Sequence, residues 1–246
     1  MGRGHAASGM AAGAACTAWG LPALDYVVPG GVWPTILLGA ILAGWSLAPD
    51  IDHERATATT AFGPFSRFTH RLAARASYHF TKATGTKYDE PREHRGLTHT
   101  PTFCVGVFVV LAVLGERWPR AVIAVVVGLA VGMLVRLLAK PPVSMAAGAL
   151  AGVALFAISV HVPGPGPLLA AGAAALGCAV HIWGDWITRE GVPLAAPWLK
   201  VRGKRWWNFR LPLVLTFKAG STTENVFVAG FWMVTLLATA KTAGVL

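Results

Sequence analysis

Seven apolar segments, each long enough to cross a lipid bilayer, constrain the fold of this chain more than any other feature of its sequence. Only 13% of its 246 residues are charged, whereas about a quarter of the residues in a soluble domain carry a charge. The sequence therefore predicts an all-α, polytopic integral membrane helical bundle of about five to seven spans, forming a single domain over residues 1–246. The expected spans are 5–28, 33–49, 100–116, 120–139, 142–162, 166–188 and 225–243.

Two polar stretches, 50–99 and 189–224, separate these spans and carry most of the cations. If the chain crosses the membrane seven times, both stretches and the N-terminus lie on one side. Of the 21 Lys and Arg residues, only Arg117, Arg120 and Lys241 then lie on the other side. Because cytoplasmic loops are enriched in Lys and Arg, we expect both stretches to face the cytoplasm.

The first polar stretch contains an amphipathic segment and the second a basic loop. In FGPFSRFTHRLAARASYHF, helical periodicity separates an apolar stripe from a basic one. The apolar stripe is Phe65, Phe68, Leu72 and Ala76, and the basic stripe is Arg67, Arg71 and Arg75. This pattern predicts an interfacial helix in the headgroup plane. The second stretch combines Pro and Gly with Trp198, Trp206 and Trp207, which indicates an interfacial loop or short hairpin. A solvated basic loop without a catalytic role is the alternative.

The net charge of +10 suits membrane lipids with anionic headgroups, or a phosphate-bearing substrate, as partners. Nucleic acid is the usual partner of a basic soluble protein, but the sequence contains no recognition motif for it, so no nucleic-acid partner is expected. The three cysteines, Cys16, Cys104 and Cys178, lie in apolar segments. Their number and spacing predict neither a disulfide framework nor a CxxC metal site.

Histidines and aspartates recur where four of the expected spans meet the cytoplasmic side. A histidine, His5, opens the first span, and APDIDH ends the second. HRGLTH opens the third span, and HIWGDW lies near the end of the sixth. Because these four places share one side of the membrane, we expect their side chains to meet at a common metal site. The residues are His5, Asp50, Asp52, His94, His99, His181 and Asp185.

Spacing within two of these motifs supports shared metal binding. His181 and Asp185 are four residues apart, so a helix places them on one face. Asp50 and Asp52 are two residues apart, so an extended or turning backbone directs both carboxylates the same way. Mixed imidazole and carboxylate ligands suit Zn²⁺, Mn²⁺ or Fe²⁺ rather than Ca²⁺. We expect one or two divalent ions, with zinc as the leading candidate.

The remaining histidines and one glutamate receive simpler interpretations. A lone histidine near a helix end is more often interfacial or hydrogen-bonded than a metal ligand. We apply this interpretation to His70 and His79 in the amphipathic segment, and to His161 on the opposite side of the membrane. Glu224, in STTEN before the last span, is expected to cap that helix, with a direct role in the site as the alternative.

Five motifs in order along the chain resemble the YdjM-type family of bacterial inner-membrane proteins, which are regarded as membrane-bound metal-dependent hydrolases. The motifs are GRGH, LAPDIDH, HRGLTHT, HIWGDWITREGVPLAAPW and FRLPLVLTFKAGSTTEN, which together extend from residue 2 to about residue 228. The resemblance implies a multi-pass protein of the bacterial inner membrane, with the family's His and Asp positions at the seven residues named above. It also implies a distant similarity to zinc-dependent phospholipase C enzymes.

These features lead to the hypothesis of a membrane-embedded metal-dependent hydrolase. It would cleave an ester or phosphoester of a lipid or lipid-linked substrate at the cytoplasmic face. Asp50 is either a further ligand or the general base. Arg95 either holds a phosphate oxygen and stabilises developing charge, or orients Asp50 or Asp52. The expected ligands are His5, Asp52, His94, His99, His181 and Asp185.

Two non-enzymatic functions are the alternatives. A metal-ion transporter needs ionisable groups near the middle of the bilayer, but the third to fifth spans carry charged residues only at their ends. A structural metal site differs from a catalytic one by the lack of an open coordination position, which a sequence does not reveal. The sequence contains neither the HExxH motif of a zincin protease nor the GxSxG motif of a serine hydrolase.

Overall fold

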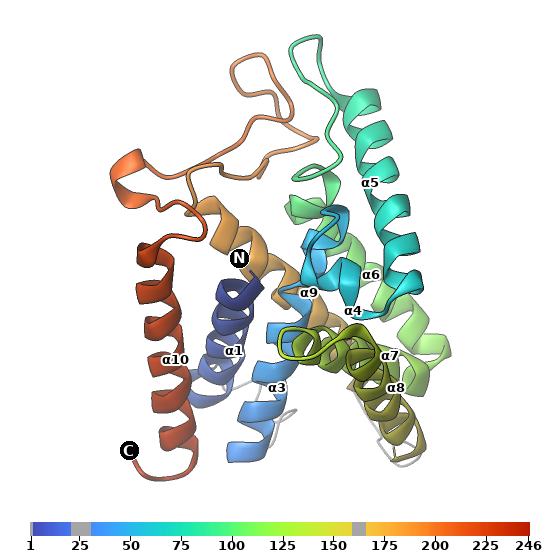
Figure 1. Cartoon of the computed structure of the whole chain (residues 1–246), viewed down its shortest axis with the longest axis vertical. Helices are drawn as coiled ribbons and strands as arrows, with labels where there is room; N and C mark the ends of the chain where they lie inside the picture. The colour runs from blue at the N-terminus through green and yellow to red at the C-terminus, as the bar shows by residue number, and fades with distance from the viewer. Residues whose placement is uncertain (1, 21–30, 159–165) are drawn as a thin grey trace.

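The computed structural model describes residues 2–20, 31–158 and 166–246, and this part of the chain is predominantly α-helical (Figure 1). The predicted all-α class is confirmed, since the described residues form only isolated β-bridges outside their helices. The α-helices are α1 (Gly2–Trp19), α3 (Val32–Trp45), α4 (Thr57–Ala61), α5 (Pro64–Thr84), α6 (Pro101–Arg117), α7 (Pro119–Arg136), α8 (Pro141–Ile158), α9 (Gly166–Trp186) and α10 (Thr222–Thr242). Short 3₁₀ turns lie at Ala48–Asp52, Leu97–His99 and Leu213–Leu215.

A helix occupies each of the seven places where a span was expected. Within the described residues, four stretches are long and apolar enough to cross a membrane: Val32–Asp52, which joins α3 to the following 3₁₀ turn, and the helices α7, α9 and α10. Helix α6 has 17 residues, α8 is a shorter apolar helix, and α1 is rich in Ala and Gly. Parts of two expected spans, 21–28 with Asp25 and 159–162 with His161, lie outside the described residues.

Prolines set the starts of three of these helices. Pro101, Pro119 and Pro141 are the first residues of α6, α7 and α8. Proline is tolerated there because the first amides of a helix have no partner within it. At α6, the Thr100 side chain also accepts a hydrogen bond from the Phe103 amide. This cap fixes the chain direction immediately after His99.

Glycines allow two helix pairs to pack with their backbones in contact. A Cβ atom added at Gly13 of α1 would lie 2.6 Å from Cα of Gly39 in α3. One added at Gly128 of α7 would lie 2.8 Å from the carbonyl oxygen of Gly148 in α8. Such close approach is typical of helices that associate in lipid.

The apolar core lies where α3, α7 and α9 meet. It includes Trp45, Val126, Ala130, Ala174 and Cys178. The Trp45 indole Nε1 donates a 3.0 Å hydrogen bond to the Val126 carbonyl, so the polar atom of this buried ring has a partner. The end of α3 is thereby held against α7, and the turn that follows it carries Asp50 and Asp52.

Helix α5 presents its apolar stripe outward. Phe65, Phe68 and Leu72 are exposed, so they do not contribute to the core. The buried face of α5 consists of the small residues Ser66, Ala74, Ser77 and Thr81. An exposed apolar stripe beside arginines is consistent with the predicted contact with a membrane surface.

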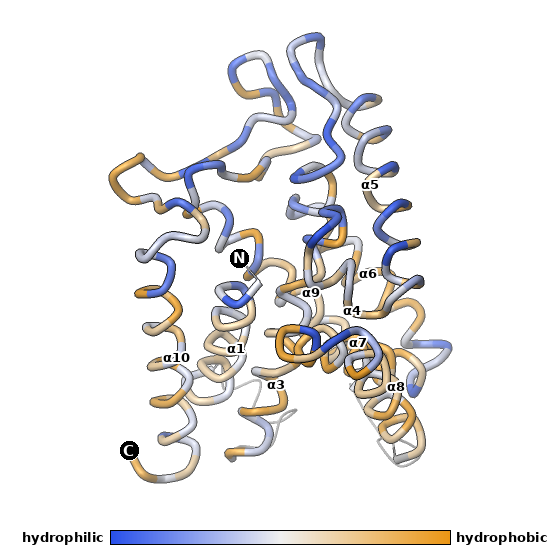
Figure 2. Tube along the Cα trace, in the orientation of Figure 1, coloured by the Kyte–Doolittle hydropathy of each residue, from blue (hydrophilic) through white to orange (hydrophobic). Residues whose placement is uncertain are grey.

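The polar stretches gather at one end of the molecule (Figure 2). The segment after α5 and the segment between α9 and α10 lie side by side there, joined by hydrogen bonds from the Arg205 and Trp206 amides to the Asp89 carboxylate. Trp206 is completely buried and packs edge to face against Phe80. The prediction that Trp206 faces the membrane interface was therefore wrong, because this ring anchors the loop to α5.

Candidate metal centre

Four separate elements bring together all seven residues predicted for the metal site. His5 lies in the first turns of α1, and Asp50 and Asp52 lie in the turn that follows α3. His99 lies in the turn Leu97–His99 that precedes α6, and His94 lies just before that turn. His181 and Asp185 lie near the end of α9. Two groups of these residues have ligand atoms within 4.8 Å of one another: Asp50, Asp52, His94 and His99, and His5, His181 and Asp185.

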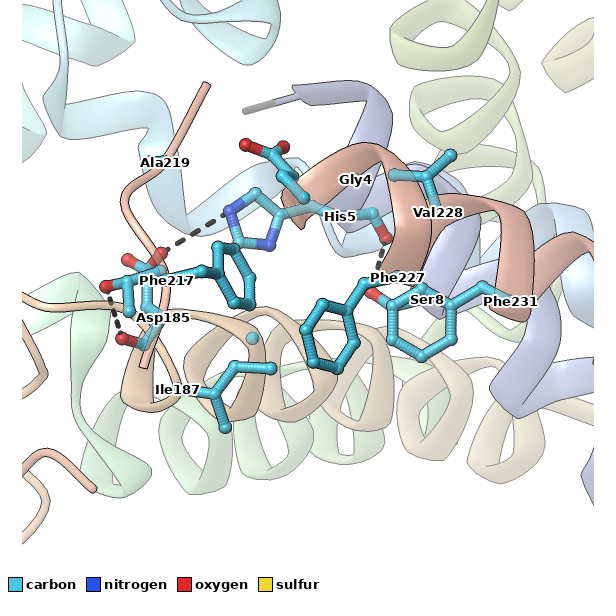
Figure 3. A pocket seen from close by; sticks show the side chains of 13 residues that line it. Gly4, His5, Ser8, Asp185, Ile187, Phe217, Ala219, Phe227, Val228 and Phe231 are labelled. Carbon is cyan, nitrogen blue, oxygen red and sulfur yellow. Dashed lines mark hydrogen bonds and ion pairs between the residues drawn. The ribbon is translucent and has the colours of Figure 1, made fainter. Parts of the chain in front are cut away.

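The group on α1 and α9 is shown in part in Figure 3. His5 Nε2 lies 3.5 Å from Asp185 Oδ1, and the His5 ring stacks on the His181 ring with centroids 3.9 Å apart. Gly184 permits this arrangement, because a Cβ atom there would lie only 3.1 Å from Nδ1 of His5. The three side chains are buried.

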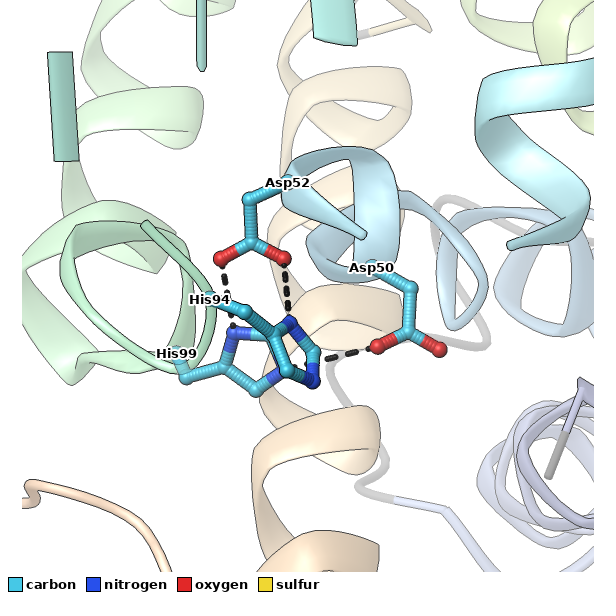
Figure 4. A group of neighbouring side chains, drawn as sticks. All are labelled: Asp50, Asp52, His94 and His99. Atoms are coloured by element: carbon cyan, nitrogen blue, oxygen red, sulfur yellow. Dashed lines mark hydrogen bonds and ion pairs between the residues drawn. The ribbon is translucent and has the colours of Figure 1, made fainter. Parts of the chain in front are cut away.

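The second group surrounds Asp52 (Figure 4). Asp52 Oδ1 lies 2.8 Å from His94 Nδ1, and Asp52 Oδ2 accepts a hydrogen bond from the Thr98 hydroxyl. Asp50 Oδ1 lies 3.5 Å from His99 Nε2. Asp52 and His99 have no exposed side-chain surface, whereas the side chains of Asp50 and His94 are 15% and 35% exposed. This group is therefore open to water on the side of Asp50 and His94.

The two groups meet at His99 and His181. Their Nε2 atoms are 3.2 Å apart. Asp50 Oδ1 lies 3.5 and 3.6 Å from these two nitrogens, and Asp185 Oδ2 lies 3.5 and 3.7 Å from them. Four potential ligand atoms therefore converge, two from each group.

The remaining ring nitrogens of both histidines have partners of their own. His181 Nδ1 lies 2.7 Å from the Ser46 carbonyl oxygen, which can only accept, so this nitrogen carries the hydrogen. His99 Nδ1 lies 3.0 Å from the Thr98 hydroxyl, whose own hydrogen is donated to Asp52. Both Nε2 atoms are then left as electron-pair donors facing each other. Such fixed partners are typical of metal-binding histidines.

An unpaired carboxylate oxygen completes the fit to a cation. Asp185 Oδ2 is buried and has no hydrogen-bond partner, which is costly unless a positive charge satisfies it. For Zn²⁺ bonded to nitrogen and oxygen at about 2.0–2.2 Å, a tetrahedron has edges of about 3.3–3.6 Å. The five separations given above, 3.2 to 3.7 Å, match those edges closely. The residues present therefore fit a tetrahedral divalent ion.

Charge supports the same interpretation. Asp50, Asp52 and Asp185 contribute three negative charges, and Arg95 contributes one positive charge. Burial disfavours the charged form of His99, but hydrogen bonds with Asp50 and Asp52 outweigh it and raise the pKa of His99 to about 10. The carboxylates thus stabilise positive charge at His99, and a metal ion at Nε2 would replace the proton there.

Arg95 contacts neither Asp50 nor Asp52. Its guanidinium lies 3.1 Å from Asp185 Oδ1 and 3.1 Å from Glu190 Oε2, and donates to the Gly191 carbonyl. Arg95 is buried and has a backbone φ of 54°, an uncommon conformation for a residue other than glycine. This conformation directs the side chain to Asp185, so Arg95 orients that carboxylate.

Several supporting residues were not identified from the sequence. Thr98 and Ser46 hold the His99 and His181 rings, as described above. Ser77 of α5 donates to the Arg92 carbonyl and accepts from the Leu97 amide, both at 3.0 Å. Thr98 could have been found because it adjoins His99 in HRGLTH, whereas nothing in the local sequence marks Ser46 or Ser77.

Residues that received simpler interpretations lie apart from the convergent atoms. His70 Nδ1 hydrogen-bonds to the Ile51 carbonyl at 2.8 Å, and His79 is exposed on α5. Glu224 accepts a hydrogen bond from the Gly220 amide at the start of α10, in keeping with the predicted capping role. It also lines a pocket beside His5.

Comparison with known proteins places the chain in a family. Neither a search of curated proteins nor a search of solved structures gave a match. One family model, described as YdjM inner membrane protein, matches residues 1–245. This match covers almost the whole chain, including all seven residues of the candidate centre. The chain therefore belongs to the YdjM inner membrane protein family.

Proposed function

We propose that this protein is a membrane-embedded, metal-dependent hydrolase that cleaves an ester or phosphoester bond of a lipid or lipid-linked substrate. The observation that carries the proposal is the convergence of two imidazole nitrogens and two carboxylate oxygens at 3.2 to 3.7 Å. One of these oxygens, Asp185 Oδ2, is buried without a hydrogen-bond partner.

Asp50, His99, His181 and Asp185 would hold one divalent ion, with zinc as the leading candidate. Such an ion would supply the Lewis acidity that lets water attack an ester or phosphoester at neutral pH. A second ion beside His5 is disfavoured, because the other oxygen of Asp185 already faces the Arg95 guanidinium at 3.1 Å. His5 packs against His181 and contacts Asp185, and His94 pairs with Asp52.

The proton acceptor is proposed to be Asp50. Its side chain is 15% exposed, whereas those of Asp52 and Asp185 are 0% and 2% exposed. Asp50 is therefore the carboxylate of the centre that water reaches most readily, and it can both bind the ion and receive a proton from the attacking water. Arg95 acts as a positioning residue that directs Asp185 Oδ2 towards the two imidazoles.

The position of the centre supports the proposed substrate class, and the charge of the polar segments supports the proposed side of the membrane. It lies where the apolar helices meet the polar segments and near the N-terminus, whereas the C-terminus lies at the opposite end (Figures 1 and 2). A centre at this level can reach a lipid headgroup without removing the lipid from the bilayer. The concentration of Lys and Arg in the polar segments supports a cytoplasmic orientation in a bacterial inner membrane.

A structural metal site is the second candidate function. Four protein ligands around one ion leave a tetrahedral site closed, as in structural zinc sites. Catalytic zinc can expand to five ligands, and the exposure of Asp50 and His94 would give water access to such a fifth position. This access favours catalysis.

One experiment separates these functions. The protein is purified in detergent, its metal is quantified by elemental mass spectrometry, and release of phosphate, diacylglycerol or fatty acid from bacterial lipid extract is assayed. His99→Ala and Asp185→Ala are compared with His79→Ala, whose imidazole lies exposed on α5. We expect one ion per chain and product release in the parent and in H79A, and neither in the other two. Metal without turnover would support a structural site, and a parent without metal would overturn the proposal.

A further inference from the structure

A pocket opens beside the metal centre between the first turns of α1, the end of α9 and the start of α10 (Figure 3). His5 and Asp185 lie at one end of it. Glu224 also lines the pocket, and its Oε2 accepts a hydrogen bond from the Gly220 amide. The rest of the wall is apolar and largely aromatic, and it includes Ile187, Phe217, Phe227, Val228 and Phe231. The rings of Phe217 and Phe227 stack with centroids 4.9 Å apart.

The hydroxyl groups in the wall have partners within the protein. Ser8 donates to the His5 carbonyl at 2.9 Å, and Thr188 donates to the Asp185 carbonyl at 2.7 Å. Neither hydroxyl therefore has a hydrogen left to donate to a ligand. A pocket lined by aromatic and aliphatic side chains then favours a hydrocarbon ligand over a sugar or a peptide.

The pocket is bordered by a helix that faces lipid. Helix α10 is long and apolar enough to span the membrane, and very little of it is buried by the rest of the protein. Its outer residues Val226, Met233 and Leu236 are more than 60% exposed. The start of α10 thus lines the pocket with one face and exposes apolar side chains on another.

The other side of the centre opens into a polar cleft. This cleft reaches Asp52 and His94 and contains side chains of both charges, Arg55, Arg67, Arg71, Glu54 and Glu93. The metal centre therefore lies between a polar cleft and an apolar pocket. A molecule that meets both has a charged or polar head and an apolar tail.

We propose that the pocket between α1, α9 and α10 binds the first part of an acyl chain of a membrane lipid, with the polar head of that lipid at the metal centre. The pocket has a volume of about 40 Å³, so the rest of the chain would lie along α10 in the bilayer. The placement of the lipid head at the metal centre rests on the proposed function. The binding of an acyl chain in the pocket does not. The occupant is the acyl chain itself, because its chemistry matches the aromatic wall and because α10 borders both the pocket and the bilayer.

Photo-crosslinking tests the inference independently of catalysis. The full-length protein is reconstituted in nanodiscs with a phosphatidic acid that carries a diazirine on one acyl chain, and the adducts are mapped by mass spectrometry after irradiation. Val228→Trp fills the pocket from α10. Val226→Trp makes the same change two residues away, at a position that is 68% exposed to the outside. Ala219→Phe, in the loop before α10, fills the pocket without changing a helix.

We expect adducts on residues 217–231 in the parent and in V226W. In V228W and A219F, labelling should fall at least about fivefold, because the larger side chain occupies the pocket and displaces the acyl chain. Equal labelling of all four proteins, or adducts spread evenly over the outer face of α10, would overturn the inference. If V228W unfolds, A219F alone decides the result.

The assay also separates this inference from the proposed function. Focused labelling in a protein that binds no metal and releases no product would retain the lipid pocket and reject the hydrolase. Hydrolysis that is equally fast for long-chain and water-soluble substrates, together with diffuse labelling, would retain the hydrolase and reject the pocket.

Discussion

Asp50 and Asp52 are two residues apart in one turn, yet their oxygens have different surroundings. Both oxygens of Asp52 face hydrogen-bonding groups, His94 on one side and Thr98 on the other. Asp50 Oδ1 instead lies 3.5 and 3.6 Å from the Nε2 atoms of His99 and His181. Asp52 was predicted as a ligand and belongs to one of the two groups of possible ligands. Because both of its oxygens already have partners, we expect it to hold the imidazoles in place.

We therefore expect Asp52→Asn and Asp50→Asn to differ in metal binding. D52N should still bind one ion per chain, with affinity lowered about 10- to 100-fold, because the orientation of the histidines is loosened while the ligand atoms remain. D50N should lose stoichiometric binding, because it removes a charged ligand. Competition with a chromophoric chelator measures both affinities, and similar losses in the two variants would contradict these roles.

Asp89 joins the two polar segments through backbone hydrogen bonds. Its carboxylate accepts from the Thr86, Arg205 and Trp206 amides at 2.8, 3.0 and 3.1 Å. Burial opposes ionisation, but these bonds outweigh it and lower the pKa of Asp89. The folded state therefore binds this proton less tightly than the unfolded state. The resulting stability is present above the ordinary pKa and is lost as pH falls through the lowered one.

Acid should thus release the loop that contains Trp206. In protein labelled with 5-fluorotryptophan, we expect the Trp206 resonance, assigned with Trp206→Phe, to shift towards its exposed position as pH falls below about 4. In Asp89→Asn, the resonance should already be shifted at neutral pH and change little in that range. A parent and a variant with the same pH profile would show that Asp89 does not hold the loop.

The candidate residues could be predicted from the sequence because each lies in a short motif, and the spacing of four between His181 and Asp185 places both on one helical face. The atoms that orient these side chains could not be predicted from the sequence. Ser46 supports His181 across 135 residues, and Arg95, with a backbone φ of 54°, contacts Asp185 of α9. Both contacts depend on how helices pack, which local patterns do not contain.

At the scale of elements, α5 positions the loop that carries His94 and Arg95. Ser77 bridges the Arg92 carbonyl and the Leu97 amide, and Thr81 accepts from the Arg92 amide at 2.8 Å. The amphipathic pattern predicted the helix correctly but drew attention to its apolar stripe. The functional contacts lie on the opposite, small-residue face, because only small side chains let the loop approach the helix.

Ser77→Ala should weaken the metal centre from a distance. The change leaves the Leu97 amide without its partner, which costs about 1–3 kcal/mol, and frees the loop that holds His94. We expect at least about tenfold weaker metal binding, because loss of a supporting hydrogen bond typically costs that much. Arg75→Ala, on the exposed face of the same helix, is the control. Identical affinities for S77A and R75A, measured by chelator competition, would show that α5 does not support the centre.

The α7–α8 pair depends on close backbone contact. A side chain at Gly148 would collide with the Gly128 carbonyl, 2.7 Å from the new Cβ atom, whereas Gly106 of α6 faces open space. Gly148→Leu should lower the unfolding midpoint in detergent by about 3–10 °C, as expected for overpacking in a chain of this size. Gly106→Leu should leave the midpoint nearly unchanged. A thermal fluorescence assay measures both midpoints. Equal shifts of the midpoint in the two variants would mean that α7 and α8 pack differently.

At the scale of the whole molecule, polarity divides the chain into two ends. The apolar segments form helices at all seven predicted places, and the polar segments gather at the end where the candidate centre lies (Figure 2). This division could be predicted because lipid requires every backbone amide to be paired within a helix. The contact between the two polar segments could not be predicted, because it depends on Asp89 and the buried Trp206, which are far apart in sequence.

Seven crossings place the two ends of the chain on opposite sides of the membrane. In a background with Cys16, Cys104 and Cys178 replaced by serine, Arg75→Cys reports on the polar end and Leu246→Cys on the C-terminus. A membrane-impermeant maleimide should label Cys at position 75 only in inverted vesicles and at position 246 only in right-side-out vesicles. This result follows if the Lys- and Arg-rich segments remain in the cytoplasm. Labelling of both positions from the same side would mean an even number of crossings, so that at least one of the seven apolar helices does not span the bilayer. Helix α6, which has 17 residues and is not among the four stretches long and apolar enough to cross a membrane, would then be the first to test.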